Sequence, residues 1–274
     1  MMMTDNVLAD IVRCLEDQLA AFQRQPAPAR AWYASCPMPG DRESAFQQWH
    51  AACFWNYPFV EVPFDMWFFF ERLAGAEIHI LHDRSGSTFN SWCEPIAGID
   101  RIPVEVIGFP LWQAYEGAVM AAHGPLPIIR PAFTPLDWAC NLYGTERFFL
   151  LLHDDEGAAG TLLERLTALY LSGCRRLREL GVDCRMPFGF HGVYANDLQM
   201  PYLSPEHVTR LLLPQYKKVA EDCGSLILSL NCADIDVMRR VLAMEGVLGC
   251  LFDKRLPMPA ITEHLGEKVF VINN

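Results

Sequence analysis

The sequence of 274 residues predicts an α/β protein, specifically a TIM-type (β/α)8 barrel whose last β/α unit is missing or atypical. Short apolar segments alternate with amphipathic segments of helical length, a pattern typical of parallel strands joined by right-handed crossovers. The glycine-rich phosphate loops of doubly wound nucleotide-binding folds are absent, which favours the barrel. We therefore predict one domain over residues 1–274, with an N-terminal helical extension over about residues 1–28.

The first half of the chain holds the less regular part of this alternation. Apolar residues at helical spacing over 5–24 predict the N-terminal helix, which ends before Pro26. Further on, a hairpin-like excursion around Ser85-Gly86 interrupts the alternation between residues 77 and 103. The predicted strands of this half are 30–36, 59–62, 77–80 and 87–92, and the helices are 42–56, 66–74 and 110–122.

The second half alternates regularly. Glycines stand where a helix must end before a strand, and Ser204-Pro205 is typical of a helix start. The predicted strands are 126–130, 182–186, 226–230, 247–252 and 269–272, and the helices are 136–153, 158–180, 205–222, 235–244 and 259–265, with a loop over 189–203. Together with the strands near residues 31 and 59, this gives seven strands for the barrel. No eighth strand is predicted, so either the sequence is incomplete, or the barrel is open or closed by something else. In the second case a partner or a loop is expected to cover the exposed strand edge.

Composition and charge exclude several classes of partner. The formal net charge is −11, and no long run of Lys or Arg is present, so nucleic acid is not expected. No segment approaches the roughly 18 apolar residues that cross a bilayer, and the N-terminus lacks the features of a signal peptide. We therefore expect a cytoplasmic protein with no membrane partner. The ten cysteines form no C-x-x-C pair and are expected to be reduced and buried.

A series of motifs, in order along the chain, resembles the uroporphyrinogen decarboxylase superfamily. The series begins with Gly124-Pro125 before a strand and the helix start in 142–148, and continues with the loop 194–207 and the segment 213–216. Residues 225–234 then occupy the place of the family's "ilHxCGd" strand end, and 266–274 that of its "GNvD" strand. The resemblance runs from about residue 60 to the C-terminus. It implies a TIM barrel with its active site at the carboxyl ends of the strands.

The resemblance implies one of two chemistries. The methyltransferase branch moves a methyl group between a corrinoid protein and an acceptor, whereas the decarboxylases remove carboxyl groups from a tetrapyrrole without a cofactor. We favour the methyltransferase branch because residues 33–40 lack the arginine-rich motif with which decarboxylases hold their polycarboxylate substrate. A tetrapyrrole carboxy-lyase and a degenerate, non-catalytic homologue that acts as a binding partner stay open. Enzymatic activity itself therefore stays open.

Cofactors and partners follow from the same resemblance. Zinc-dependent members of the methyltransferase branch bind the ion through H-x-C and a later cysteine, but this chain reads Leu230-Asn231-Cys232, and the later cysteine would fall beyond residue 274. Zinc is therefore not expected, and Cys232 alone stays a metal candidate. No tightly bound cofactor is expected. The implied ligand is a small molecule or a tetrapyrrole or corrinoid, and a corrinoid protein and a second copy of this chain are the partners left open.

The candidate site residues are polar residues that follow predicted strands or lie in the loops beyond them, where a barrel has its active site. Carboxylates and imidazoles suit proton transfer, and amides and guanidinium groups suit substrate binding. The catalytic candidates are Asp197, His191 and Asp253. The substrate-binding candidates are Asp65, Arg130, Asn231, Asp234 and Asn273.

For Asp197 the sequence supports a more detailed expectation. We expect its side chain to lie half desolvated at the mouth of the barrel, where the pKa of a carboxyl group is raised. Asp197→Asn is then expected to change the free energy of unfolding by less than about 1 kcal/mol. The structural alternative is a turn or a helix cap, and Asp234 has the same alternative at the start of the helix 235–244.

Overall fold

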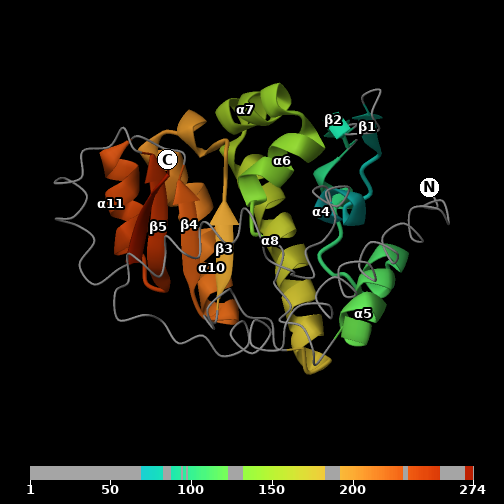
Figure 1. Ribbon diagram of the computed structural model, residues 1–274. Helices are drawn as coiled ribbons and strands as arrows, with labels where there is room; N and C mark the ends of the chain where they lie inside the picture. The colour runs from blue at the N-terminus through green and yellow to red at the C-terminus, as the bar shows by residue number, and fades with distance from the viewer. Residues whose placement is uncertain are drawn as a thin grey trace.

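Two sheets and a set of helices make up the part of the chain that the computed structural model describes (Figure 1). This part comprises residues 69–82, 88–93, 95–96, 98–122, 132–182, 192–230, 234–253 and 269–273. The strands are β1 (Ile78–His82), β2 (Thr88–Cys93), β3 (Val193–Asn196), β4 (Leu226–Leu230), β5 (Val247–Asp253) and β6 (Val269–Asn273). The helices are α4 (Phe69–Leu73), α5 (Pro110–Ala122), α6 (Pro135–Tyr143), α7 (Thr145–Asp154), α8 (Glu156–Glu179), α9 (Pro205–His207), α10 (Leu213–Cys223) and α11 (Ile235–Ala243), with shorter turns η2 (Ile99–Arg101), η4 (Met200–Tyr202) and η5 (Val208–Leu212).

The larger sheet is parallel, and its described strands follow the order β3-β4-β5-β6. Sequential, parallel order is what strand–helix alternation predicts, and it is confirmed for these four strands. A bridge at Phe133 continues the sheet beyond β3, since the Phe133 N–H donates to the carbonyl of Tyr194 at 2.9 Å and its carbonyl accepts the N–H of Asn196 at 3.3 Å. The segment before α6 therefore lies beside β3.

One face of this sheet packs against helices. Val193 and Ala195 of β3 and Leu226 and Leu228 of β4 are fully buried and share a core with residues of α10 and α11. Because side chains alternate along a strand, Asn196 belongs to the opposite face. The sheet thus has one apolar face under the helices and a second face that carries polar residues such as Asn196.

The irregular excursion predicted over 77–103 is confirmed as a separate unit. β1 and β2 form an antiparallel hairpin, and η2 follows it. Arg165 of α8 donates to the carbonyls of Asp100 at 2.9 Å and Ile102 at 2.5 Å. Ser172, also on α8, accepts the N–H of Val106 at 3.0 Å. These contacts fix the segment after η2 along α8. α8 is the longest described helix, and no described helix is both long and apolar enough to span a membrane.

Most predicted elements that fall in the described residues are confirmed with small shifts at their ends. The predicted helix 136–153 divides into α6 and α7 at Gly144, whose φ of +88° favours glycine. The predicted loop 189–203 is wrong, because it contains β3 and η4. β3 has only four residues, two of them polar or amphipathic, so its alternation is too short to stand out.

Several predicted elements lie outside the described residues. They include the N-terminal extension, the strands 30–36, 59–62 and 126–130, nearly all of the strand 182–186, and the helices 42–56 and 259–265. The barrel, its missing or atypical last β/α unit, the number of its strands and the single-domain organisation therefore stay predictions.

Candidate functional site

The carboxyl edge of the parallel sheet brings together several of the predicted site residues. Asp197 directly follows β3, Asp253 ends β5, and Asn273 ends β6. Asp253 and Asn273 are register partners, so the two strand ends lie side by side. Asp234 stands at the start of α11, beyond the end of β4. Ligands of parallel α/β proteins bind at this edge, and it is therefore the candidate site.

Asp197 is fully buried, which corrects the expectation of a half-desolvated side chain at the barrel mouth. Its Oδ1 accepts the N–H groups of Leu136 at 2.9 Å and Asp137 at 3.2 Å, in the first turn of α6. Its Oδ2 accepts the hydroxyl of Tyr216 at 2.5 Å. A carboxylate fits here because the first N–H groups of a helix have no partner within the helix. These contacts give Asp197 a positioning task, and its catalytic role stays a prediction.

Asp137 makes the reciprocal contacts. Its two carboxylate oxygens accept the N–H groups of Leu198 and Gln199, each at 3.0 Å, in the turn that follows Asp197. The segment after β3 and the start of α6 thus each supply one carboxyl group, which accepts two N–H groups of the other segment. Burial, and then repulsion by Asp137, raise the pKa of Asp197 well above its usual range. Burial also raises the pKa of Asp137, although the N–H groups of Leu198 and Gln199 oppose that rise.

The helix after Asp197 brings Tyr216 to the carboxyl pair. α9 continues through the π-helical turn η5 into α10, and Pro214 lies just after η5. Proline has no N–H to donate to the preceding turn, which accounts for the wider turn at this place. Tyr216 is fully buried, and its ring lies 6.0 Å from that of Phe133 in an edge-to-face arrangement. Tyr216 therefore joins the helix layer, the bridge at Phe133 and Asp197.

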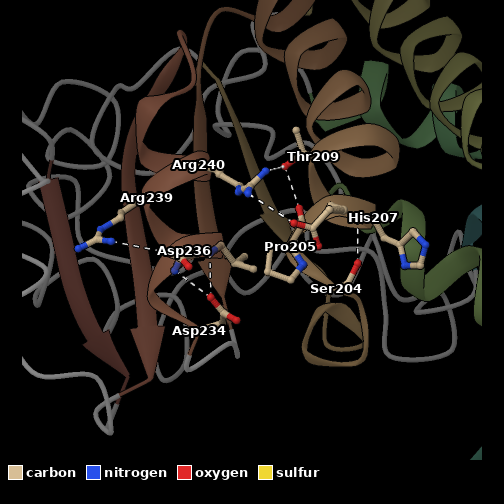
Figure 2. A network of polar contacts seen from close by, with 10 residues as sticks. Ser204, Pro205, His207, Thr209, Asp234, Asp236, Arg239 and Arg240 are labelled. Atoms are coloured by element: carbon tan, nitrogen blue, oxygen red, sulfur yellow. Dashed lines mark hydrogen bonds and ion pairs between the residues drawn. The ribbon is translucent and has the colours of Figure 1, made fainter.

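A polar network joins the start of α9 to α11 (Figure 2). Ser204 accepts the N–H of His207 at 3.2 Å and so caps α9. Arg240 of α11 donates to the hydroxyl of Thr209 at 2.8 Å and lies 3.7 Å from a carboxylate oxygen of Glu206. The charged side chains are exposed, so their pairing adds little stability. The network joins the last turn of α11 to the residues at and just after the start of α9.

Asp234 caps α11, as the structural alternative proposed. Its Oδ1 accepts the N–H groups of Asp236 at 2.8 Å and Val237 at 3.1 Å (Figure 2). The side chain is exposed, so ligand contact through the second oxygen stays a prediction.

Loss of this cap has a measurable expected effect. Asp234→Ala is expected to lower the free energy of unfolding by about 1 kcal/mol, because two N–H groups of the first turn lose their acceptor. Urea unfolding followed by circular dichroism measures it. Asp236→Ala is the matched control, since the exposed Asp236 side chain pairs with Arg239 at 3.2 Å within the same helix and its loss should change stability by less than about 0.5 kcal/mol. Equal effects of the two substitutions would contradict the capping role.

Two polar residues with incomplete hydrogen bonding were not among the predicted site residues. Glu71 of α4 is fully buried; its Oε1 accepts the amide of Asn141 at 2.8 Å, whereas its Oε2 has no hydrogen-bond partner in the described part of the chain. Burial raises the pKa of Glu71 to about 7, and Asp137 adds to the rise. Asn196, at the end of β3, likewise has a buried Oδ1 without a partner among the described residues. The sequence around Glu71 and Asn196 gave no signal of this, because whether a side chain has a hydrogen-bond partner depends on the tertiary structure.

The remaining candidates do not enter this geometry. His191, Asp65, Arg130, Asn231 and Cys232 lie outside the described residues. Within the described ranges, no group of three or more His, Cys, Asp or Glu side chains is placed to hold a metal ion. β4 ends at Leu230, so the strand position where the resemblance places a zinc-binding imidazole carries an aliphatic residue. The donor set at this strand end does not fit the zinc site of the methyltransferase branch.

Comparison with known proteins finds a likeness of fold and none of sequence family. The sequence matches no protein-family model and none of the curated proteins. Its fold is similar to that of a solved structure, a methyltransferase from Methanosarcina mazei, with a TM-score of 0.52 over 73% of this chain and a sequence identity of 13%. The matched region covers 59% of the methyltransferase chain. At this identity the likeness is one of fold.

Proposed function

We propose that the protein is a methyltransferase with a uroporphyrinogen decarboxylase-like barrel, and that it transfers a methyl group to or from a corrinoid protein. The observation that carries the proposal is the fold likeness to the methyltransferase from Methanosarcina mazei, at a TM-score of 0.52 over 73% of this chain. The parallel, sequential sheet and the polar residues at its carboxyl edge support it. A corrinoid protein and a second copy of the chain are the proposed partners.

In methyl transfer from a corrinoid to a thiol, the protein supplies a base that accepts the thiol proton. The cobalt–carbon bond breaks with its electron pair left on cobalt, a sulfur–carbon bond forms, and the thiol proton passes to a base. Asp253, at the carboxyl edge beside Asn273, is the proposed base, because a carboxylate at the end of a strand stands where a substrate binds. Because the donor set after β4 does not fit zinc, no step is assigned to that ion.

The test is the demethylation of methylcobalamin by a thiol under anaerobic conditions, followed by the absorbance change of the corrinoid. We expect the protein to accelerate this reaction and Asp253→Asn to slow it by about 100-fold, as expected for loss of a general base. Glu245→Gln is the matched control, because Glu245 is exposed and precedes β5 at the opposite edge of the sheet. No acceleration by the wild-type protein, with either protein-bound or free methylcobalamin, would contradict the proposal.

A second candidate function is supported by one specific observation. Leu230 stands where a zinc-dependent methyltransferase has an imidazole, which favours a non-catalytic homologue that binds a corrinoid or its protein. The same experiment separates the two: a binding homologue gives a saturable spectral change of methylcobalamin without loss of the methyl group. Release of carbon dioxide from uroporphyrinogen would instead support the carboxy-lyase alternative.

A further inference from the structure

Asn196 ends β3 at the carboxyl edge of the sheet, on the face away from α10 and α11. Its backbone takes part in the sheet, because its N–H donates to the carbonyl of Phe133 at 3.3 Å and it pairs with Ser229 in the register of β3 and β4. Its side chain, in contrast, has a buried Oδ1 with no partner among the described residues. We propose that Asn196 is a ligand-binding residue, and that its Oδ1 accepts a hydrogen bond from an N–H or O–H group of the bound molecule.

A buried oxygen that loses water and gains no donor destabilises the folded chain, and most buried side-chain oxygens in proteins are therefore paired. The neighbouring Asp197 shows the usual outcome, since both of its oxygens accept hydrogen bonds from the protein. Asn196, one residue earlier, has an amide whose oxygen no described group satisfies. An unsatisfied group at the binding edge of a parallel sheet is what a site for a donor-bearing ligand requires.

The Asn196 side chain is uncharged, and this limits the kinds of ligand that its oxygen can bind. A neutral amide oxygen accepts hydrogen bonds and does not attract an anion, and the chain as a whole carries a net charge of −11. A neutral ligand with amide N–H donors fits this oxygen better than a polycarboxylate. This inference rests on the proposed function in one respect: the corrin ring carries peripheral carboxamides, whose N–H groups are such donors. Asn196 would then select the amide form of the ring.

The test compares two corrinoids and two variants. Cobinamide carries peripheral carboxamides, whereas heptamethyl cobyrinate carries uncharged methyl esters that have no N–H donor. Equilibrium titration followed by absorbance gives the affinity of the wild-type protein for each. We expect cobinamide to bind about 10-fold more tightly than the ester, and Asn196→Leu to weaken cobinamide binding by about 10-fold while leaving the ester unaffected. If Asn196→Leu no longer prefers cobinamide over the ester, the preference of the wild-type protein is due to Asn196.

Thermal unfolding of the free protein gives an independent readout. Asn196→Leu is expected to leave the Tm unchanged or to raise it, because it removes an unpaired buried oxygen. Asn141→Leu is the matched control, since the Asn141 amide donates to Glu71 at 2.8 Å and its loss should lower the Tm. A fall in the Tm of Asn196→Leu equal to that of Asn141→Leu would make Asn196 a structural residue and overturn the inference.

The outcomes separate this inference from the function on which it rests. If the wild-type protein binds cobinamide and Asn196→Leu binds it equally well, Asn196 is not a ligand-binding residue, and the proposed function is unaffected. If the wild-type protein binds neither corrinoid, the corrinoid function fails, and the assignment of amide recognition to Asn196 fails with it.

Discussion

Asp197→Ala is expected to lower the free energy of unfolding by about 3–5 kcal/mol, the largest effect of any substitution proposed for this protein. The substitution leaves the N–H groups of Leu136 and Asp137 and the hydroxyl of Tyr216 without their acceptor. Leu136 and Tyr216 are fully buried, so water does not replace the lost carboxylate without cost. Urea unfolding at neutral pH measures the change.

The exposed cap of α8 supplies the matched control. Asp155 also caps a helix, accepting the N–H of Ala158 at 3.0 Å, but its side chain is exposed. Asp155→Ala should therefore cost only about 1 kcal/mol. If Asp197→Ala and Asp155→Ala lower the free energy of unfolding equally, the buried contacts of Asp197 contribute nothing beyond ordinary capping.

The contact between Asp197 and Tyr216 can be isolated. Tyr216→Phe removes only the hydroxyl and should cost about 1–2 kcal/mol, because Asp197 keeps its two N–H donors. In a double-mutant cycle the two substitutions should be non-additive, since both remove the same 2.5 Å hydrogen bond. Additive effects would place the stabilisation by Asp197 entirely at the start of α6.

Much of the fold in the second half of the chain could be predicted from its sequence. The structure contains the helices predicted over 158–180 and 205–222 and the strand predicted over 226–230. Their apolar residues have the spacing typical of a helix or a strand, and each segment has a clear end signal. Gly224, for example, ends α10 with a φ of +107°, two residues before β4 begins. Local pattern and tertiary structure agree at these places.

The site was less predictable. Strand–helix alternation placed Asp253 at a strand end, and the family resemblance added Asn273; the register shows that the two residues are neighbours at this edge. The burial of Asp197 was missed because its partners, Leu136 and Tyr216, lie 61 and 19 residues away along the chain. Glu71 was missed for a related reason: within its own helix it resembles an ordinary acidic residue of a first turn. Hydrogen bonds and desolvation of this kind arise from packing between elements, which sequence spacing does not report.

Glu71 should make the stability of the protein fall as the pH rises. Burial raises its pKa from 4.5 to about 7, so the folded chain binds a proton there more tightly than the unfolded chain does. A group with a raised folded-state pKa contributes its full stabilisation below the unfolded pKa and loses it as the pH rises through the folded pKa. The loss therefore occurs between about pH 4.5 and pH 7 and amounts to about 3 kcal/mol.

Glu71→Gln removes this dependence and should be the more stable protein in neutral and alkaline solution. Near pH 4.5 Glu71→Gln and the wild type should unfold with similar free energies; by pH 8 the glutamine variant should be more stable by about 3 kcal/mol, because it has no charge to bury and its amide can still accept the N–H of Asn141. Asp137 and Asp197 titrate in both proteins, so the difference between the two unfolding curves belongs mainly to Glu71. Glu77→Gln is the control, since Glu77 is exposed beyond the end of α4 and should leave the pH dependence of the wild type in place. Parallel stability curves for the wild type and Glu71→Gln between pH 4.5 and pH 8 would show that the pKa of Glu71 is not raised in the folded protein.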